Sequence, residues 1–222
     1  MDNTGKIIKE SVKEFSDQFV NSMRSVKKGF TVKDKGGDLG ISNNFLIKDL
    51  KARPDGGAFL LAEEFNSFTV STSDGRGGRT YISTYIYGDK FVCGIDPNGQ
   101  FEWLVNIPTN MIYDRPDIGT YVSFLSQDKL YLIYSDNEDN LKQKLNQRPI
   151  DNTKLKKVST AIVSIDNKTG KAERNALIDS KDEKFLLLPN VSANINNELF
   201  ILGGKFGMYQ VKEYRIARIS VK

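Results

Sequence analysis

The densest group of oxygen-bearing side chains in this sequence is the acidic run DNEDN, which begins at Asp136. Carboxylate and amide oxygens at alternate positions suit calcium, so Asp136, Glu138 and Asn140 are the candidate metal ligands. An EF-hand loop needs glycine at its sixth position and glutamate at its twelfth, where this chain has Leu141 and Gln147. A solvated acidic loop is therefore favoured over a specific calcium site, and no cofactor is predicted.

A glycine-rich run, GRGGR at residues 75–79, could hold a phosphate through its backbone N–H groups. No Lys-Ser or Lys-Thr pair follows it and no helix start is evident, so it matches neither the P-loop nor the dinucleotide-binding motif. Arg76 and Arg79 from this run, with Tyr113 and Arg115 further along, are the candidate ligand-binding residues on loops. A flexible loop that binds nothing is the favoured alternative.

Paired carboxylates could serve glycoside hydrolysis if two of them lay about 5–10 Å apart across a substrate. Glu63 follows a strand pattern, and Glu102 or Asp114 could complete such a pair. Spacing in the sequence does not test this arrangement, and ion pairs with nearby Arg or Lys are favoured. Aromatic side chains could also line a sugar or peptide site, although Trp103 is expected to pack in the core.

Histidine is absent from the chain, which excludes Ser-His-Asp and Cys-His catalysis as well as histidine-ligated zinc. Cys93 is the only cysteine, so no intrachain disulfide or thiolate cluster can form. We expect Cys93 to be a small buried side chain rather than a reactive thiol.

The composition is that of a folded chain, with 222 residues, 39% of them hydrophobic and 27% charged. The net charge is +4, and the basic residues are dispersed among acids, which argues against a nucleic-acid partner. No apolar run reaches the ~20 residues of a membrane helix. The first residues do not resemble a signal peptide. We expect a cell-envelope or secreted protein if the full-length protein carries a leader, and a cytoplasmic one otherwise.

The element that recurs along the chain is a β-hairpin. In FVCGIDPNGQFEWLVNI, residues 91–107, apolar residues alternate on both sides of a turn that begins at Asp96 and contains Gly99. Residues 162–178 repeat the pattern, with Asp166 in place of Asp96 and Gly170 in place of Gly99. A shortened copy of the same pattern stands at the start of the chain, in DNTGKI.

Strands on either side of these hairpins predict a repeated four-stranded unit. The repeats span roughly residues 45–107, 121–178 and 191–222, and the last one lacks its fourth strand. Two polar insertions, residues 66–80 and 136–157, separate the second strand from the third in the first two repeats. The strands expected in order are 45–50, 58–64, 81–87, 91–95, 101–107, 121–125, 129–135, 158–165, 171–178, 191–195, 198–203 and 214–221, with a bulge or a short turn at residues 88–89.

Four antiparallel strands used in series predict an all-β, β-propeller-like fold with about three blades. A β-sandwich is the alternative, although it has no need of a hairpin repeated at one register. Residues 1–222 would form one propeller-like domain, the C-terminal part of a larger ring, because propellers use about 4–8 blades. An N-terminal strand at 5–11 could complete the last blade. Residues 11–27 have apolar side chains at helical spacing and predict one short helix, inserted in the all-β chain.

Several segments resemble a group of uncharacterised, often exported bacterial proteins that are expected to be β-propeller-like repeat proteins. The group shows a DGG-aromatic strand followed by Glu, a G-x-x-x-W hairpin and an IYxDN segment. The matching segments here are KEFSDQFV (13–20), FLIKDLKARPDGGAFLLAEEF (45–65), YGDKFVCGIDPNGQFEWLVNIP (87–108) and KLYLIYSDNEDN (129–140). The resemblance implies a propeller-like fold and a cell-envelope location, and it implies no reaction.

The preferred hypothesis is a non-enzymatic, propeller-like scaffold that binds a protein, peptide or glycan through its loop face. It rests on two long polar insertions, 66–80 and 137–157, at equivalent positions of a repeat. The alternative is a propeller hydrolase or lyase that uses carboxylates and a divalent ion. A third hypothesis is a structural envelope repeat without a ligand. No nucleic acid and no membrane span are expected, and the sequence predicts no particular oligomeric state.

Overall fold

The computed structural model describes residues 45–73, 75–116, 118–126, 128–151, 157–178, 185–195, 198–206 and 211–220. Within these ranges the chain is all-β, as the alternating apolar pattern predicts, and its strands form three antiparallel sheets. The expected helix at 11–27 and the expected N-terminal strand at 5–11 lie outside the described residues.

The first sheet has the strand order β1-β2-β3-β4, and β5 continues the line of β4 along β3. β5 has only three residues, too few to show an alternating pattern, and the sequence analysis does not predict it. The strands are β1 (Phe45–Ala52), β2 (Ala58–Ser73), β3 (Arg79–Ile95), β4 (Phe101–Ile107) and β5 (Met111–Tyr113).

The middle sheet, β6-β7-β8-β9, and the last sheet, β10-β11-β12, are antiparallel meanders in which neighbours in sequence pair. The middle strands are β6 (Tyr121–Ser126), β7 (Lys129–Asn137), β8 (Val158–Asp166) and β9 (Ala172–Ile178), with a turn of 3-10 helix at Asn140–Lys142. The last strands are β10 (Phe185–Ile195), β11 (Glu198–Phe206) and β12 (Val211–Ile219).

The two aspartate turns occupy equivalent positions, because each joins the third strand of its sheet to the fourth. The N–H of Gly99 donates to the Asp96 carbonyl at 2.9 Å, and the N–H of Gly170 donates to the Asp166 carbonyl at 3.0 Å. Both glycines have positive φ, 77° and 69°, a conformation that glycine adopts without steric cost. Both turns therefore close through a glycine N–H and the aspartate carbonyl, although the turn at Asp166 contains one residue more than the turn at Asp96.

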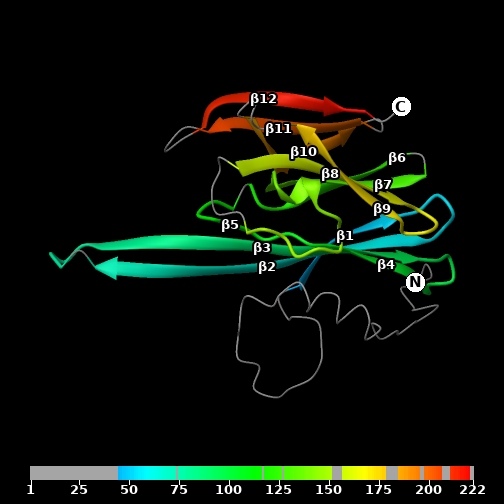
Figure 1. Cartoon of the computed structure of the whole chain (residues 1–222), viewed down its shortest axis with the longest axis horizontal. Coiled ribbons are helices and arrows are strands. Elements are labelled where there is room, and N and C mark those ends of the chain that lie inside the picture. Colours follow the sequence, from blue (N-terminus) through cyan, green and yellow to red (C-terminus); the bar gives the residue numbers. More distant parts are fainter. Residues whose placement is uncertain are drawn as a thin grey trace, which may run out of the picture.

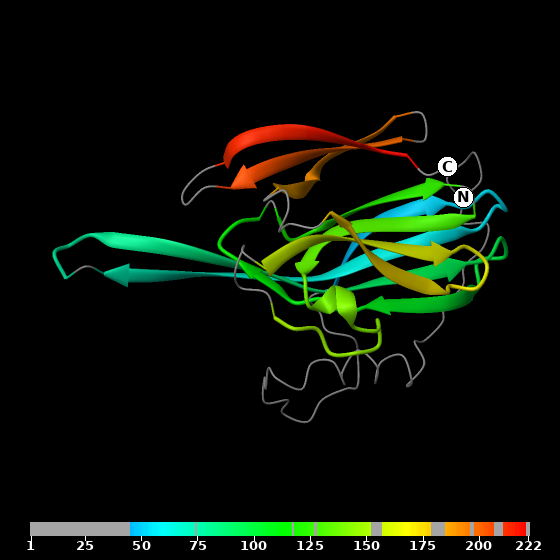
Figure 2. The ribbon, with the colours of Figure 1, turned by 45° about the horizontal axis from the view of Figure 1, so that its top comes forward.

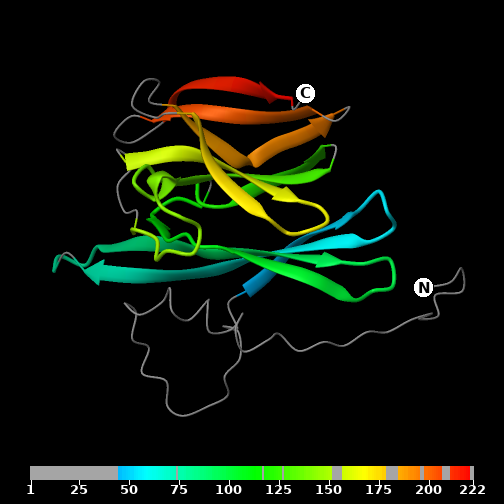
Figure 3. The ribbon, with the colours of Figure 1, turned by 45° about the vertical axis from the view of Figure 1, so that its right-hand side comes forward.

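The three sheets stack as layers, with the middle sheet between the other two (Figures 1 and 3). One core cluster joins the first sheet to the middle sheet through Phe59, Leu61, Leu130 and Leu132, among others. Another joins the middle sheet to the last through residues that include Phe124, Ile133, Leu199 and Ile201. The middle sheet is thus covered on both faces, and within the described ranges the stack does not close into a ring.

The polar segment 66–80 is the main correction to the sequence analysis, because it is not an insertion loop. β2 and β3 run through it and remain paired as far as Ser73 and Arg79. Figure 2 shows the result, a two-stranded arm that projects well beyond the stacked sheets. Its Ser and Thr residues alternate with Phe68 and Val70 on β2, and threonine and aromatic residues favour extended strands. The polarity of the segment therefore reflects exposure to solvent, not the absence of a strand.

Candidate functional site

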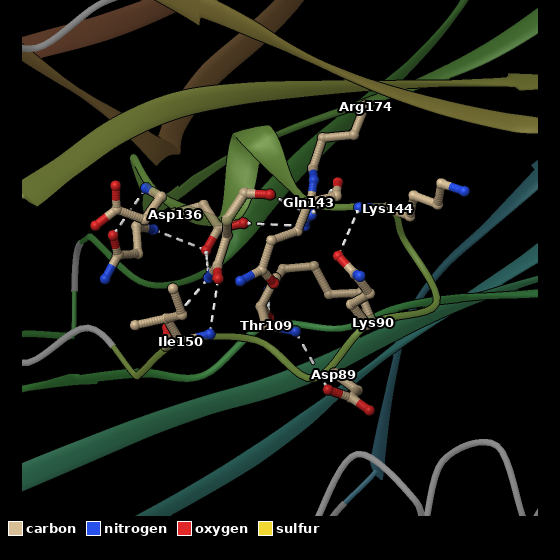
Figure 4. A network of polar contacts seen from close by, with 12 residues as sticks. Asp89, Lys90, Thr109, Asp136, Gln143, Lys144, Ile150 and Arg174 are labelled. Carbon is tan, nitrogen blue, oxygen red and sulfur yellow. Dashed lines mark hydrogen bonds and ion pairs between the residues drawn. The ribbon is translucent and has the colours of Figure 1, made fainter.

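Charged side chains from β2 and β3 meet in the interior, between the first sheet and the middle sheet. Glu63 and Lys90 are cross-strand partners, and both side chains are fully buried. Lys90 Nζ lies 3.2 Å from Glu63 Oε1 and donates a hydrogen bond to Thr109 Oγ1 at 3.0 Å (Figure 4). The ammonium also lies 5.0 Å from the ring centre of Tyr134, within cation–π distance.

The second oxygen of Glu63 is also occupied. Thr120 Oγ1 donates to Glu63 Oε2 at 2.8 Å, and Lys48 Nζ lies 3.7 Å from the same oxygen. Glu102, which the sequence analysis considered as a partner carboxylate, forms an ion pair with Arg53 instead. Each glutamate thus faces a cation, which is the arrangement that the sequence analysis favoured over a hydrolytic pair.

A second buried ion pair joins β7 to β9. Asp136 Oδ2 lies 3.3 Å from Arg174 Nη1, and both side chains are almost completely buried. Asp136 Oδ1 accepts hydrogen bonds from the Asn137 N–H at 2.7 Å and from Asn140 Nδ2 at 2.8 Å. Burial raises the pKa of Asp136, and the Asn140 amide and the Arg174 charge oppose that shift. Asp136 therefore lies at the end of a strand, not in the solvated loop that the sequence analysis predicts.

Arg174 also fastens the segment that follows β7. Its Nη2 donates to the carbonyl of Asn140 and, at 3.2 Å, to the carbonyl of Gln143 (Figure 4). These carbonyls belong to the 3-10 helix and to the residue just after it. The guanidinium thus holds the start of the second polar insertion against β9.

The structure brings two of the three metal-ligand candidates together, because Asn140 Nδ2 donates to Asp136 Oδ1, but their oxygens already have partners within the protein. Arg174 stands beside the Asp136 carboxylate, where a cation would have to bind. Asn140 Oδ1 accepts a hydrogen bond from the Ile150 N–H at 2.7 Å, and Glu138 follows the end of β7. Among the described residues, no group of three or more His, Cys, Asp or Glu side chains is placed to hold a metal ion.

The four ligand-binding candidates fall in two separate places. Arg76 lies at the tip of the arm, and Arg79 is the first residue of β3. Tyr113 belongs to β5 and is buried in a core cluster with Leu186 and other residues, so it does not offer a surface contact. Arg115 follows β5 near the base of the arm. Two of the four therefore lie in strands, and the two arginines of the arm are separated from Tyr113 and Arg115 by the length of the arm.

The arm is the surface feature that the sequence analysis missed. Its register sets Val70 opposite Ile82 and Phe68 opposite Thr84, so the three apolar side chains share one face. Phe68 and Val70 are each 49% exposed and Ile82 is 52% exposed. Alternation of Phe68 and Val70 with small polar residues was the signal available in the sequence.

Trp103 packs between the first sheet and the middle sheet, as expected for a core aromatic. Its ring lies against Gly94 and Gly170, and its Nε1 donates to the Asn167 carbonyl at 3.3 Å. A Cβ added at Gly170 would come within 2.6 Å of the indole ring. Cys93 is a buried free cysteine, as the sequence analysis predicts.

Comparison with known proteins finds no match for this chain, whether among family models, curated proteins or solved structures. In the part of the chain that the structure describes, no helix is both long and apolar enough to cross a membrane. The stack of sheets, the buried ion pairs and the arm are the features of the described structure that bear on function.

Proposed function

We propose that this chain is a non-enzymatic binding scaffold with a propeller-like arrangement of sheets, and that it binds a protein, a peptide or a glycan. The exposed β2–β3 arm is the observation that carries the proposal. A two-stranded ribbon is marginally stable in water, and exposed apolar groups on one usually mark an interaction surface. The arm stands on a rigid, well-packed body, which suits it to contact a partner.

The direction in which equivalent residues point supports the propeller-like arrangement. Phe59 pairs with Gly94 and Tyr131 pairs with Ser164, and each of these partners lies two residues before the aspartate of its turn. Phe59 faces the middle sheet, whereas Tyr131 faces the last sheet. The face that carries Phe59 in the first sheet and Tyr131 in the middle sheet thus packs each time on the next sheet in the chain. Successive blades of a propeller pack in this way.

The buried charges support binding over catalysis. Glu63 is matched by Lys90, and Asp136 is matched by Arg174. A charge in a low-dielectric interior requires such a partner, so these four side chains stabilise one another. None of them is left to exchange a proton with a substrate.

The test is an arm-less variant in which residues 68–84 are replaced by Asn-Gly, so that a two-residue turn joins Ser67 to Tyr85. The biotinylated chain and this variant are compared for capture of proteins from a bacterial lysate and for binding to a glycan array. We expect specific capture by the chain, loss of capture by the variant and a similar thermal midpoint for both. The control is Lys171→Ala, an exposed position on the turn before β9. Equal capture by the arm-less variant contradicts the proposal.

A further inference from the structure

One edge of the arm is long and carries no charge. β1 pairs with β2 only as far as Glu64, so within the described ranges β2 has no neighbour on that side from Asn66 to Ser73. This stretch reads NSFTVSTS and contains neither a charged residue nor a proline. Proteins usually place such residues on exposed edges to prevent pairing with other chains. Among the described residues, the β2 edge is therefore open to β-strand addition.

The opposite edge of the arm is less suitable. β5 pairs with β3 from Tyr85 onward, which leaves only the segment between Arg79 and Thr84. This shorter edge begins with a charged side chain, and a charge disfavours pairing of an edge with another strand. The β2 edge is thus the better template for an added strand.

We propose that the β2 edge pairs antiparallel with the β2 edge of a second copy of this chain, so that the two arms form a four-stranded sheet. This inference rests on the proposed function, because it names the partner that the arm binds. Two identical edges can pair about a twofold axis, which gives a closed dimer. We place the axis at Thr69, at the middle of the free edge, so that Phe68 lies opposite Val70 of the second copy.

This register brings the exposed apolar side chains together. Phe68, Val70 and Ile82 lie on one face of the arm. A twofold axis perpendicular to the plane of the paired sheet places this face on the same side in both copies. The two sets then form one continuous apolar stripe on a four-stranded sheet, and a wider sheet is more stable than a ribbon. A shift of one residue would set Phe68 against the polar face of the second copy.

The charges at the two ends of the arm agree with this arrangement. Arg76 and Arg79 lie at the tip, and Glu64 lies at the base, just before the free edge begins. Antiparallel pairing along the whole free edge brings the tip of each arm to the base of the other. Arg76 at the tip of one copy then approaches Glu64 at the base of the other, at both ends of the paired arms.

The test uses charge substitutions at Thr69, which is exposed and lies on the proposed twofold axis. Thr69→Lys and Thr69→Glu each place two like charges opposite each other in the dimer, whereas a mixture of the two variants pairs opposite charges. Thr80→Lys is the matched control, because it adds the same charge to β3, the strand that faces away from the second copy. Sedimentation velocity measures the mass of each sample from low to high micromolar concentration.

We expect the full chain to be a dimer that dissociates on dilution, and each Thr69 variant to dimerise up to about fivefold more weakly. The mixture of the two should recover the dimer, which also shows that both variants are folded, and Thr80→Lys should behave like the unmodified chain. A full chain that stays monomeric, or a Thr69→Lys variant that dimerises normally, overturns the proposal. If the chain is monomeric but the arm-less variant still loses capture, the arm binds another partner and only the second-copy proposal fails.

Discussion

Lys90 and Glu63 form an ion pair between two side chains that solvent does not reach. Substitution of Lys90 by methionine keeps the length of the side chain but leaves the glutamate without its closest charge. Loss of one partner from a buried pair typically costs about 3–5 kcal/mol. We expect Lys90→Met to lower the free energy of unfolding by this amount, measured by urea denaturation.

Two controls separate the lost charge from the lost packing. The double variant Glu63→Gln with Lys90→Met has no buried charge at this position, and the amide oxygen of the new side chain can still accept the Thr120 hydrogen bond, so it should recover a large part of the loss. Lys171→Met removes a lysine that is 77% exposed and should change stability by less than about 0.5 kcal/mol. A Lys90→Met variant as stable as Lys171→Met would show that the buried pair does not stabilise the fold.

At the residue scale, the sequence identifies polar groups but not their partners. Asp136 stands out in the acidic run, yet the cation beside it, Arg174, is 38 residues away in the chain. Only the pairing of β7, β8 and β9 brings the two together. Cross-strand register likewise makes a pair of Glu63 and Lys90, and register is not evident from alternation alone. The sequence therefore indicated ion pairs in general and could not assign them.

At the element scale, the turn at Gly170 provides a test of how the first sheet and the middle sheet fit together. Alanine at Gly170 would force a positive φ and would also overlap the Trp103 ring. Alanine at Gly99 would force a similar φ but would meet no atom within 4 Å. We expect Gly99→Ala to cost about 1–2 kcal/mol, which is the backbone term alone. We expect Gly170→Ala to cost at least about 1 kcal/mol more, because the indole must move.

Fluorescence of Trp103, the only tryptophan of the chain, reports on this contact directly. Gly170→Ala should shift the emission of the folded protein, and Gly99→Ala should leave it unchanged. Equal stability losses with unchanged emission in both variants would show that the indole does not pack against the Gly170 turn.

The turns were predictable at this scale because aspartate, asparagine and glycine favour tight turns whatever the rest of the fold. The arm was not, because threonine favours strands whereas serine and glycine favour turns, and the segment between residues 66 and 80 contains all three. The pairing of β2 with β3 from Asn66 to Ser73 shows that the segment is a strand. Phe68 and Val70 lie on one face of this strand. Apolar residues that alternate with polar ones inside a polar segment thus indicate a strand, even where every side chain is exposed.

At the scale of the whole molecule, the order of the strands could be predicted and the closure of the stack could not. Short connections between neighbours in sequence favour meanders, and each of the three sheets contains one. Closure depends on the angle between successive sheets and on how many there are, which strand patterns do not encode. The sequence analysis therefore describes the layers correctly as all-β and antiparallel, whereas the propeller remains a proposal.

The stack itself predicts a gradient of local stability. The middle sheet packs against a neighbour on both faces, through one cluster that contains Leu132 and another that contains Ile133. Within the described ranges the last sheet is covered less completely: one face packs on the middle sheet, and on the other face Leu202 contacts a core cluster whereas Tyr214 and Ile216 are 59% and 72% exposed. Amide protection follows the buried contacts of each unit. We expect the amides of β7 and β8 to exchange only on global unfolding, and those of β11 at least about tenfold faster.

Hydrogen exchange followed by mass spectrometry distinguishes this gradient from uniform cooperativity. β11 is the right strand for comparison with β7, because both are paired on two sides and neither is an edge of its sheet. A difference between them therefore reports coverage of the sheet faces, not strand pairing. If β11 exchanges as slowly as β7, the three sheets open as one cooperative unit, and coverage of the sheet faces does not set their local stability.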